Sequence, residues 1–284
     1  MQITIHTHAQ DFLAQTQDVL LQNEAANNLM LGISMRLQAQ PDYYGSIPFL
    51  ATVTDEHGLL VAACMTPPNR LILYSQRPEK HQAALDTLVE YLQNHQVVFP
   101  GCIGPVKVAE DFARSWQTAT GQSYRIAVRE RVFELTEVLQ PPITTGRLRQ
   151  ATQGDRELLL KWMLAFAKEA HLDQPADDIT RSLPIRLANG DFFFWETPAS
   201  RIVSMAAKGR AMRTVINIGP VYTPPEARGK GYASSCVSAL SQRLLDNGWR
   251  ACSLFTDLSN PTSNSIYQKI GYRPLEDVYD IAFI

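Results

Sequence analysis

Two apolar patterns alternate along the chain, and both halves carry them in the same order. Apolar residues at helical spacing predict helices, and short apolar or alternating segments bounded by turn residues predict strands. In the first half we expect helices at 11–22, 24–37, 79–94 and 106–118, and strands at 49–54, 59–65, 70–74, 96–99 and 124–135. In the second half we expect helices at 155–170, 175–188, 231–247 and 262–270, and strands at 191–195, 202–207, 214–222, 250–256 and 278–284.

A segment without apolar periodicity separates the halves. Residues 137–147 contain Pro141, Pro142 and Gly146, a composition typical of a linker. The chain has 284 residues, which suits two domains. We therefore expect an α/β (α+β) protein with two tandem domains of similar fold, at 1–138 and 147–284, joined by a linker at 139–146. Each domain is expected to hold a mixed twisted sheet flanked by helices.

The segment with the clearest chemistry is 221–233, which reads V-Y-T-P-P-E-A-R-G-K-G-Y-A. It joins a predicted strand to a predicted helix, whose first backbone N–H groups have no partner inside the helix and carry a positive partial charge. Gly229 and Gly231 would let an anion approach the main chain, and Arg228 and Lys230 add positive charge. This arrangement predicts a phosphate-binding loop.

Two common phosphate loops are excluded by single residues. The pattern G-x-x-x-x-G-K-[ST] fails because Lys230 is followed by Gly231, and G-x-G-x-x-G fails because Ser234 stands where its third glycine belongs. The pattern that remains, R-x-x-G-x-A at 228–233, resembles the acetyl-CoA loop of the GNAT acetyltransferase superfamily. An ordinary helix start with basic residues is the alternative for this motif alone.

Two further features extend the resemblance to about residues 147–284. Gly219-Pro220 interrupts the preceding strand, where a bulge helps to separate neighbouring strands in the family. Residues 257–272 resemble the family segment D-x-x-N-x-x-(A/S)-x-x-x-Y-x-x-x-G-F, with Tyr272 in the last place as a core residue. The first half has no such loop, since residues 75–80 lack glycine and include Pro78. We expect it to be a degenerate GNAT-like domain that shapes a substrate groove, with Tyr43 and Tyr44 as candidate lining residues.

The resemblance implies roles for particular residues. Tyr267 would protonate the departing thiolate, because a phenol with a pKa of about 10 keeps its proton at neutral pH; packing against the sheet is its alternative role. Asn264 could be a cofactor contact or a cap. The expected cofactor-binding residues are Val221, Tyr222, Thr223, Arg228, Gly229, Lys230, Gly231, Tyr232, Ala233, Ser234, Asn260 and Asn264.

A general base is not assigned by the sequence. Many family members carry a glutamate near the position of Val215, and the polar residue on this strand, Asn217, cannot accept a proton. The candidates by residue type are Glu196, Asp191, Glu226 and His171, each of which also fits a turn or a solvated surface.

Composition limits the partners and the compartment. The net charge of −2 gives no general attraction to nucleic acid or to an anionic membrane. A membrane-spanning helix needs about 20 apolar residues, and no apolar run is that long. The first residues lack the pattern of a signal peptide. The four cysteines, Cys64, Cys102, Cys236 and Cys252, are scattered among apolar residues without ligand spacing, so we expect core thiols, no metal and a cytoplasmic protein.

The resulting hypothesis is an N-acetyltransferase that uses acetyl-CoA. The acetyl group would pass to a primary amine of an unidentified small molecule or peptide by direct attack in a ternary complex. An acyl-CoA-binding sensor or regulatory module without turnover is the alternative, and an interaction module without cofactor is the third. We expect no nucleic-acid or membrane partner, and a monomer or a homodimer.

Overall fold

The computed structural model describes residues 1–77, 80–170 and 176–284. It contains two compact units. The first unit is formed by Met1–Phe133, Phe255–Asn260 and Pro274–Ile284, and the second by Glu134–Leu254 and Pro261–Arg273. The units thus differ from a linear division at 139–146, because the end of the chain counts with the first unit.

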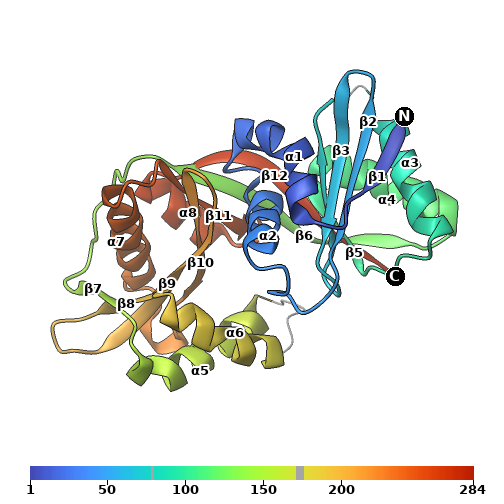
Figure 1. Ribbon diagram of the computed structural model, residues 1–284. Helices are drawn as coiled ribbons and strands as arrows, with labels where there is room; N and C mark the ends of the chain where they lie inside the picture. The colour runs from blue at the N-terminus through green and yellow to red at the C-terminus, as the bar shows by residue number, and fades with distance from the viewer. Residues whose placement is uncertain (78–79, 171–175) are drawn as a thin grey trace. The chain divides into compact units, whose positions relative to one another are not determined.

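The first unit has helices on both faces of a mixed sheet (Figure 1). Its helices are α1 (Ala9–Leu20), α2 (Asn28–Ala39), α3 (His81–Asn94) and α4 (Val106–Thr120). Its strands, in sheet order, are β1 (Gln2–Ile5), β2 (Phe49–Asp55), β3 (Gly58–Met65), β4 (Leu71–Ser75), β5 (Gly101–Pro105), β12 (Arg273–Phe283) and β6 (Tyr124–Leu135). The core forms where β2, β3 and β4 pack against α3 and α4, with Leu88 and Phe112 fully buried.

The last strand of the chain completes the sheet of the first unit. β12 pairs antiparallel with β5, from Val278 opposite Pro105 to Ala282 opposite Gly101, and its other neighbour is β6. The two backbones approach closely, since a Cβ atom at Gly101 would overlap the carbonyl oxygen of Ile281. Glycine is required here by space.

Three strands differ from the sequence predictions. The strand predicted at 96–99 is wrong: Gln96 lies in a turn, residues 97–99 have no regular secondary structure, and the strand is β5. Gly101, Gly104 and Pro105 give β5 no strand-like composition. The short strands β1 and β7 (Arg147–Gln150), four residues each, were not predicted. They form by pairing with β2 and β8 (Phe192–Glu196), contacts that local periodicity does not reveal.

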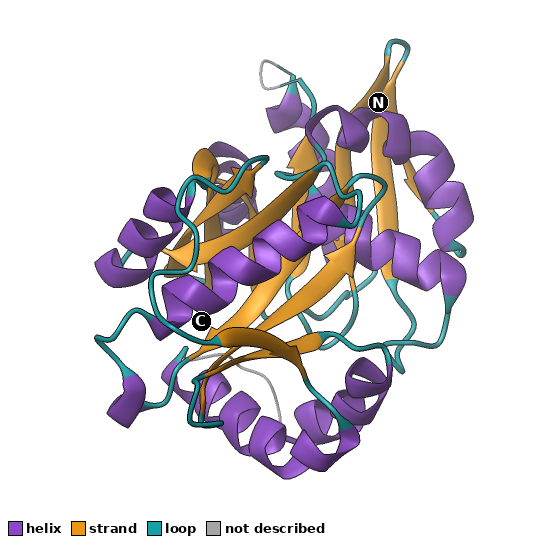
Figure 2. Cartoon of the chain, turned by 90° about the vertical axis from the view of Figure 1, so that its left-hand side faces the viewer, coloured by secondary structure: helices purple, strands orange, loops and turns teal. Residues whose placement is uncertain are grey.

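The second unit also has helices on both faces of its strands (Figures 1 and 2). Its helices are α5 (Arg156–Glu169), α6 (Ala176–Ala188), α7 (Tyr232–Asp246) and α8 (Pro261–Ile270). Its strands follow the order β11 (Ala251–Asp257), β10 (Val215–Tyr222), β9 (Ile202–Ala211), β8 and β7. Phe192 and Phe194 pack with α5 and α6, whereas Phe193 lies under Arg243 of α7 at 5.2 Å, as strand alternation requires. The predicted α/β architecture of mixed sheets flanked by helices is confirmed.

The cysteines lie in the interior, as expected. All four are free and buried, and burial raises the pKa of Cys64 and of Cys252 to about 12. They therefore stay protonated at neutral pH and pack as small apolar groups. Across residues 1–77, 80–170 and 176–284, no helix is both long and apolar enough to cross a membrane.

The close approach at Gly101 provides a stability test. Gly101→Ala is expected to lower the free energy of unfolding by about 2 kcal/mol or more, because the added methyl group meets backbone rather than a movable side chain. Urea unfolding followed by circular dichroism measures the change. Gly154→Ala is the control, since its Cβ would make only an ordinary contact of 3.7 Å with Thr152. Equal effects of the two substitutions would show that β12 does not pack against β5 in this way.

Candidate functional site

Strand β10 is irregular where Gly219 and Pro220 interrupt its sequence. Its pairing with β9 changes register between Ile216 and Ile218, and again between Ile218 and Val221. Proline has no N–H to contribute to a ladder, so a regular strand cannot continue through this position. The bulge expected at this position is therefore present.

Beyond this point β10 also loses its partner on the other side. Its parallel pairing with β11 covers Val215 to Asn217, opposite Ala251 to Ser253, and no further pair is found among the described residues of the second unit. Residues 218–222 consequently keep one backbone edge without a partner strand in their own unit. Such an edge can accept an extended ligand through main-chain hydrogen bonds. Val221 and Tyr222 lie on it, and Thr223 follows directly.

A glycine-containing loop joins this edge to helix α7. The 3₁₀ helix Pro225–Ala227 comes first, and α7 begins at Tyr232 with Gly231 as its N-cap. Gly229 and Gly231 have φ values of 74° and 78°, a left-handed conformation that glycine adopts without strain. The first backbone hydrogen bond of the helix runs from Ser235 N to Gly231 O at 3.0 Å.

The backbone N–H groups of this loop are available to a ligand. Within the described ranges, the N–H groups from Gly229 through Ser234 donate to no backbone oxygen. A Cβ atom at Gly229 would meet nothing within 4 Å, so the space beside this residue is open. Together with the positive end of the α7 dipole, these donors form an arrangement that suits a phosphate group.

The side chain of Arg228 fixes the loop to the end of β10. Its Nε donates to the carbonyl oxygen of Thr223 at 2.9 Å, and its Nη2 pairs with Glu169 Oε2 at 2.6 Å. The guanidinium also lies 5.7 Å from the centre of the Tyr222 ring, whose hydroxyl contacts Glu169 Oε1 at 3.3 Å. Arg228 therefore holds the loop in position. Lys230 Nζ donates to a backbone carbonyl within the loop, that of Glu226, at 3.2 Å.

Glu169 is the residue of this cluster that sequence reasoning missed. It ends α5, 59 residues before its partner Arg228, and no local motif marks it. Glu169 contacts both Arg228 and the hydroxyl of Tyr222, and so links α5 to the end of β10. Burial raises the pKa of Tyr222, the charge of Glu169 raises it further, and Arg228 opposes both, so Tyr222 stays protonated at neutral pH.

The predicted linker packs against the first turn of α7. The backbone N–H groups of Ile143 and Thr144 both donate to Ser235 Oγ, at 3.2 and 3.1 Å. A Cβ atom at Gly231 would lie 2.8 Å from Cδ1 of Ile143. Two features therefore favour glycine at position 231: its φ is positive, and the linker leaves no space for a side chain.

Tyr267, the predicted proton donor, lies in α8. Its side chain is half-buried, and its ring meets that of Tyr272 edge to face at 5.8 Å. Tyr272 is the core residue of the two, with its hydroxyl 2.8 Å from Ser241 Oγ. The hydroxyl of Tyr267 has no hydrogen-bond partner among the described residues, and burial raises its pKa to about 12. It is therefore protonated at neutral pH and free to donate.

The structure places the remaining predicted residues in two groups. Asn264 is half-buried on α8, one turn before Tyr267, in the second unit. Asn260 ends the segment Phe255–Asn260, which counts with the first unit. The residues gathered in the second unit are Val221, Tyr222, Thr223, Arg228, Gly229, Lys230, Gly231, Tyr232, Ala233, Ser234, Asn264 and Tyr267.

Comparison with known proteins shows which fold carries this arrangement. The family model for FR47-like proteins matches residues 200–280, and no curated protein sequence matches the chain. An acetyltransferase of the GNAT family from Colwellia psychrerythraea has a similar structure, with 12% identity, 100% and 99% of the two chains covered, and a TM-score of 0.60. A GCN5-related N-acetyltransferase from Sphaerobacter thermophilus has 13% identity, 99% and 95% coverage, and a TM-score of 0.65.

A third similar structure has two domains of this kind in one chain. It is a tandem GNAT protein from the clavulanic acid biosynthesis pathway, with 11% identity, 100% and 98% coverage, and a TM-score of 0.60. The fold is that of the GNAT acetyltransferases. The resemblance drawn from the sequence is thus confirmed for the fold, including its tandem form.

Within this GNAT fold, two of the candidate bases are engaged in ion pairs. Glu196 is buried, and its carboxylate oxygens lie 3.0 Å from Arg147 and 2.9 Å from Arg149. Asp191 lies 3.5 Å from Arg186. Both carboxylates are thus bound to guanidinium groups of their own unit.

The remaining polar candidates are not in ion pairs of this kind or lie outside the described residues. Glu226 is exposed on the 3₁₀ helix before the loop. Asn217 donates from Nδ2 to the carbonyl oxygen of Ser253 at 3.3 Å, which ties β10 to β11. His171 lies outside the described residues.

The contact between linker and loop can be tested by a double-mutant cycle. Gly231→Ala is expected to lower the unfolding free energy by about 1–3 kcal/mol, through its positive φ and the contact with Ile143. Ile143 is 55% exposed, so Ile143→Ala alone should cost less than about 1 kcal/mol. Ile143→Ala removes the side chain that the new methyl group at 231 would meet. The double variant should therefore lose less unfolding free energy than the sum of the two single variants, by about 0.5 kcal/mol or more. Strict additivity in urea unfolding would argue against packing of the linker on this loop.

Proposed function

We propose that the chain is an N-acetyltransferase that moves the acetyl group of acetyl-CoA to a primary amine of a small molecule or peptide. The observation that carries this proposal is the combination, in one GNAT-like unit, of an unpaired edge on β10 with free N–H groups at the start of α7. The unpaired edge would hold the pantetheine arm of coenzyme A, and the N–H groups that follow it would hold the pyrophosphate. The match of residues 200–280 to the FR47-like family supports the same region.

The residues of the second unit fit the cofactor chemically. Backbone N–H groups from Gly229 through Ser234 would hold the pyrophosphate, and the open space beside Gly229 gives it access to the main chain. Val221, Tyr222 and Thr223 would hydrogen-bond the amide groups of the pantetheine arm. Arg228 would act on the cofactor indirectly, through its contacts with Thr223 and Glu169.

The chemistry needs few groups of the protein. Acetyl-CoA, when bound, supplies a thioester that a neutral amine can attack directly in a ternary complex. A backbone N–H near Val221 would polarise the thioester carbonyl. Tyr267 holds a proton on its hydroxyl oxygen for the departing sulfur, because its pKa of about 12 keeps the phenol neutral.

Composition supports the expected partners and compartment. The net charge of −2 provides no strong field for nucleic acid, and a small or peptide amine needs none. Free, buried cysteines fit a reducing compartment, so we place the protein in the cytoplasm within the same proposal.

A second candidate function, cofactor binding without turnover, has one observation in its favour. β10 carries Val215 and Asn217 but no carboxylate, and Glu196 and Asp191 are held in ion pairs. An acyl-CoA sensor would bind acetyl-CoA through the same loop and would transfer nothing. Binding and transfer are therefore tested separately.

Cofactor binding can be tested with two variants that differ in charge. Gly229→Asp and Gly229→Asn have side chains of equal size, both tolerate positive φ, and neither Cβ meets an atom within 4 Å. Gly229→Asp should weaken acetyl-CoA binding at least about tenfold, since its carboxylate would repel a pyrophosphate bound at this loop. Gly229→Asn should stay close to the wild type. Isothermal titration calorimetry measures both.

The outcome also limits the proposal. If the wild type does not bind acetyl-CoA, the proposed enzyme and the alternative sensor both fail, and only the fold stands. If both variants weaken binding equally, the loop is disturbed by any side chain, and the charge argument is wrong.

Transfer can be tested at Tyr267. Tyr267→Phe should lower kcat by about 10–100-fold with the dissociation constant of acetyl-CoA unchanged, because only the proton for the sulfur is removed. Release of the CoA thiol with the best acceptor from an amine panel is the assay. Tyr91→Phe, a half-buried tyrosine of α3, is the control. Unchanged kcat in Tyr267→Phe would remove it from the mechanism, and absence of transfer with intact binding would favour the sensor.

A further inference from the structure

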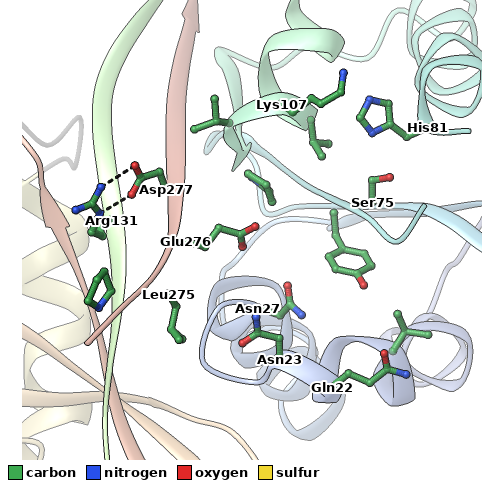
Figure 3. Close-up of a pocket in the computed structure, with 16 residues that line it drawn as sticks. Gln22, Asn23, Asn27, Ser75, His81, Lys107, Arg131, Leu275, Glu276 and Asp277 are labelled. Carbon is green, nitrogen blue, oxygen red and sulfur yellow. Dashed lines mark hydrogen bonds and ion pairs between the residues drawn. The ribbon is translucent and has the colours of Figure 1, made fainter. Parts of the chain in front are cut away.

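A cavity lies within the first unit at the place where its parallel strands separate (Figure 3). Among the described residues, β4 and β5 pair only through Leu71 and Ile72, opposite Cys102 and Ile103. The cavity opens beyond these pairs, has a volume of about 800 Å³, and is lined by Tyr74 among others. This volume is in the range of small-molecule sites.

The electrostatics of the cavity depend on which charges are already paired. Arg131 binds Asp277 with two hydrogen bonds, of 2.5 and 2.9 Å, and Lys107 binds the buried Asp111 at 2.6 Å. Glu276, in contrast, has no hydrogen bond or ion pair among the described residues. The cavity therefore holds one carboxylate whose charge is not compensated.

The orientation of Glu276 places this carboxylate at the cavity. Figure 3 shows its side chain extending away from the Arg131–Asp277 pair, toward the side on which Asn23 and Asn27 lie. Burial and then the nearby charge of Asp277 raise the pKa of Glu276. A cation beside it would offset both effects.

Two more buried polar atoms of the lining lack partners. Ser75 Oγ and His81 Nδ1 have no hydrogen bond among the described residues, and the His81 side chain is only 2% exposed. His81 Nε2 lies 2.6 Å from Asp111 Oδ2 and donates to it, so Nδ1 is the ring nitrogen left for a ligand. The lining thus offers polar atoms that a ligand with several polar hydrogens could satisfy.

An anionic ligand does not suit this cavity. Residues 75–80 correspond in position to the loop before α7 in the second unit. Their basic side chains are already engaged, since Arg77 and Lys80 both bind Asp55, at 2.8 and 3.4 Å. Pro78, expected to remove a donor from this segment, lies outside the described residues. With Glu276 uncompensated, a phosphate would meet repulsion and few free donors.

We propose that the cavity of the first unit binds a small monocationic amine, whose ammonium group pairs with Glu276. The apolar side chains of Val19, Val106 and Leu275 belong to the lining and can contact the carbon skeleton of the ligand. A single uncompensated carboxylate matches a single positive charge. The site lies in the first unit, and the proposal does not require acetyl transfer.

Calorimetric titration without acetyl-CoA tests this site. The probes are 1-aminohexane and 2-phenylethylamine, each with its alcohol counterpart as a neutral ligand of the same shape. We expect the amines to bind at least about tenfold more tightly than the alcohols, because a charge-assisted hydrogen bond is lost in the alcohols. Glu276→Gln should weaken amine binding at least about tenfold for the same reason.

Two matched variants complete the test. Glu90→Gln makes the same change at an exposed position of α3 and should bind the amines like the wild type. Leu275→Trp, at a lining residue that is 39% exposed, should reduce amine binding by filling space without changing charge. Thermal unfolding of each variant shows whether it is folded. Leu275→Trp keeps the test decisive if Glu276→Gln does not fold.

The outcomes separate this proposal from the proposed function. No amine binding by the wild type overturns it, and so does equal binding by wild type, Glu276→Gln and Leu275→Trp, which would place the amine elsewhere. Gly229→Asp should bind the amines like the wild type, because its change is in the other unit. Loss of acetyl-CoA binding and loss of amine binding are thus independent results.

Discussion

Both candidate binding sites of this structure lie where two parallel strands stop pairing. A buried backbone must have its N–H and C=O groups hydrogen-bonded, so strands that separate leave an edge that something else has to satisfy. β10 and β11 share three residue pairs before they separate, and β4 and β5 share two. The candidate cofactor site lies at the first of these openings, and the cavity with Glu276 lies at the second.

The same geometry carries different chemistry in the two units. In the second unit, Gly229 and Gly231 adopt positive φ angles and leave the N–H groups at the start of α7 without backbone acceptors, which favours an anion. In the first unit, the cations of the corresponding segment are bound to Asp55, and Glu276 brings an uncompensated negative charge. Under the two proposals, one fold would provide sites of opposite charge preference, because backbone geometry fixes the opening and side chains fix its potential.

The segment between the halves is more than a spacer. Its backbone donates to Ser235 in the first turn of α7, and Ile143 occupies the space that a side chain at 231 would need. The loop is fixed from the other side by Arg228, which reaches Thr223 and Glu169. Backbone donors can bind a phosphate group well only when their conformation is set in advance, and these contacts would set it for the proposed cofactor loop.

The sequence alone determined the elements with local signals. Amphipathic helices such as α7, long strands such as β6 and the turn chemistry around Gly219 and Gly229 follow from contacts within a few residues. The fold class could therefore be predicted, and the loop before α7 could be named as a candidate phosphate site. Only the tertiary structure decided which distant segments meet. It placed β12 beside β5, formed a strand from the glycine-rich residues of β5, and brought Glu169 to Arg228. Strand pairing and charge pairing join residues far apart in the chain, and periodicity carries no information about such contacts.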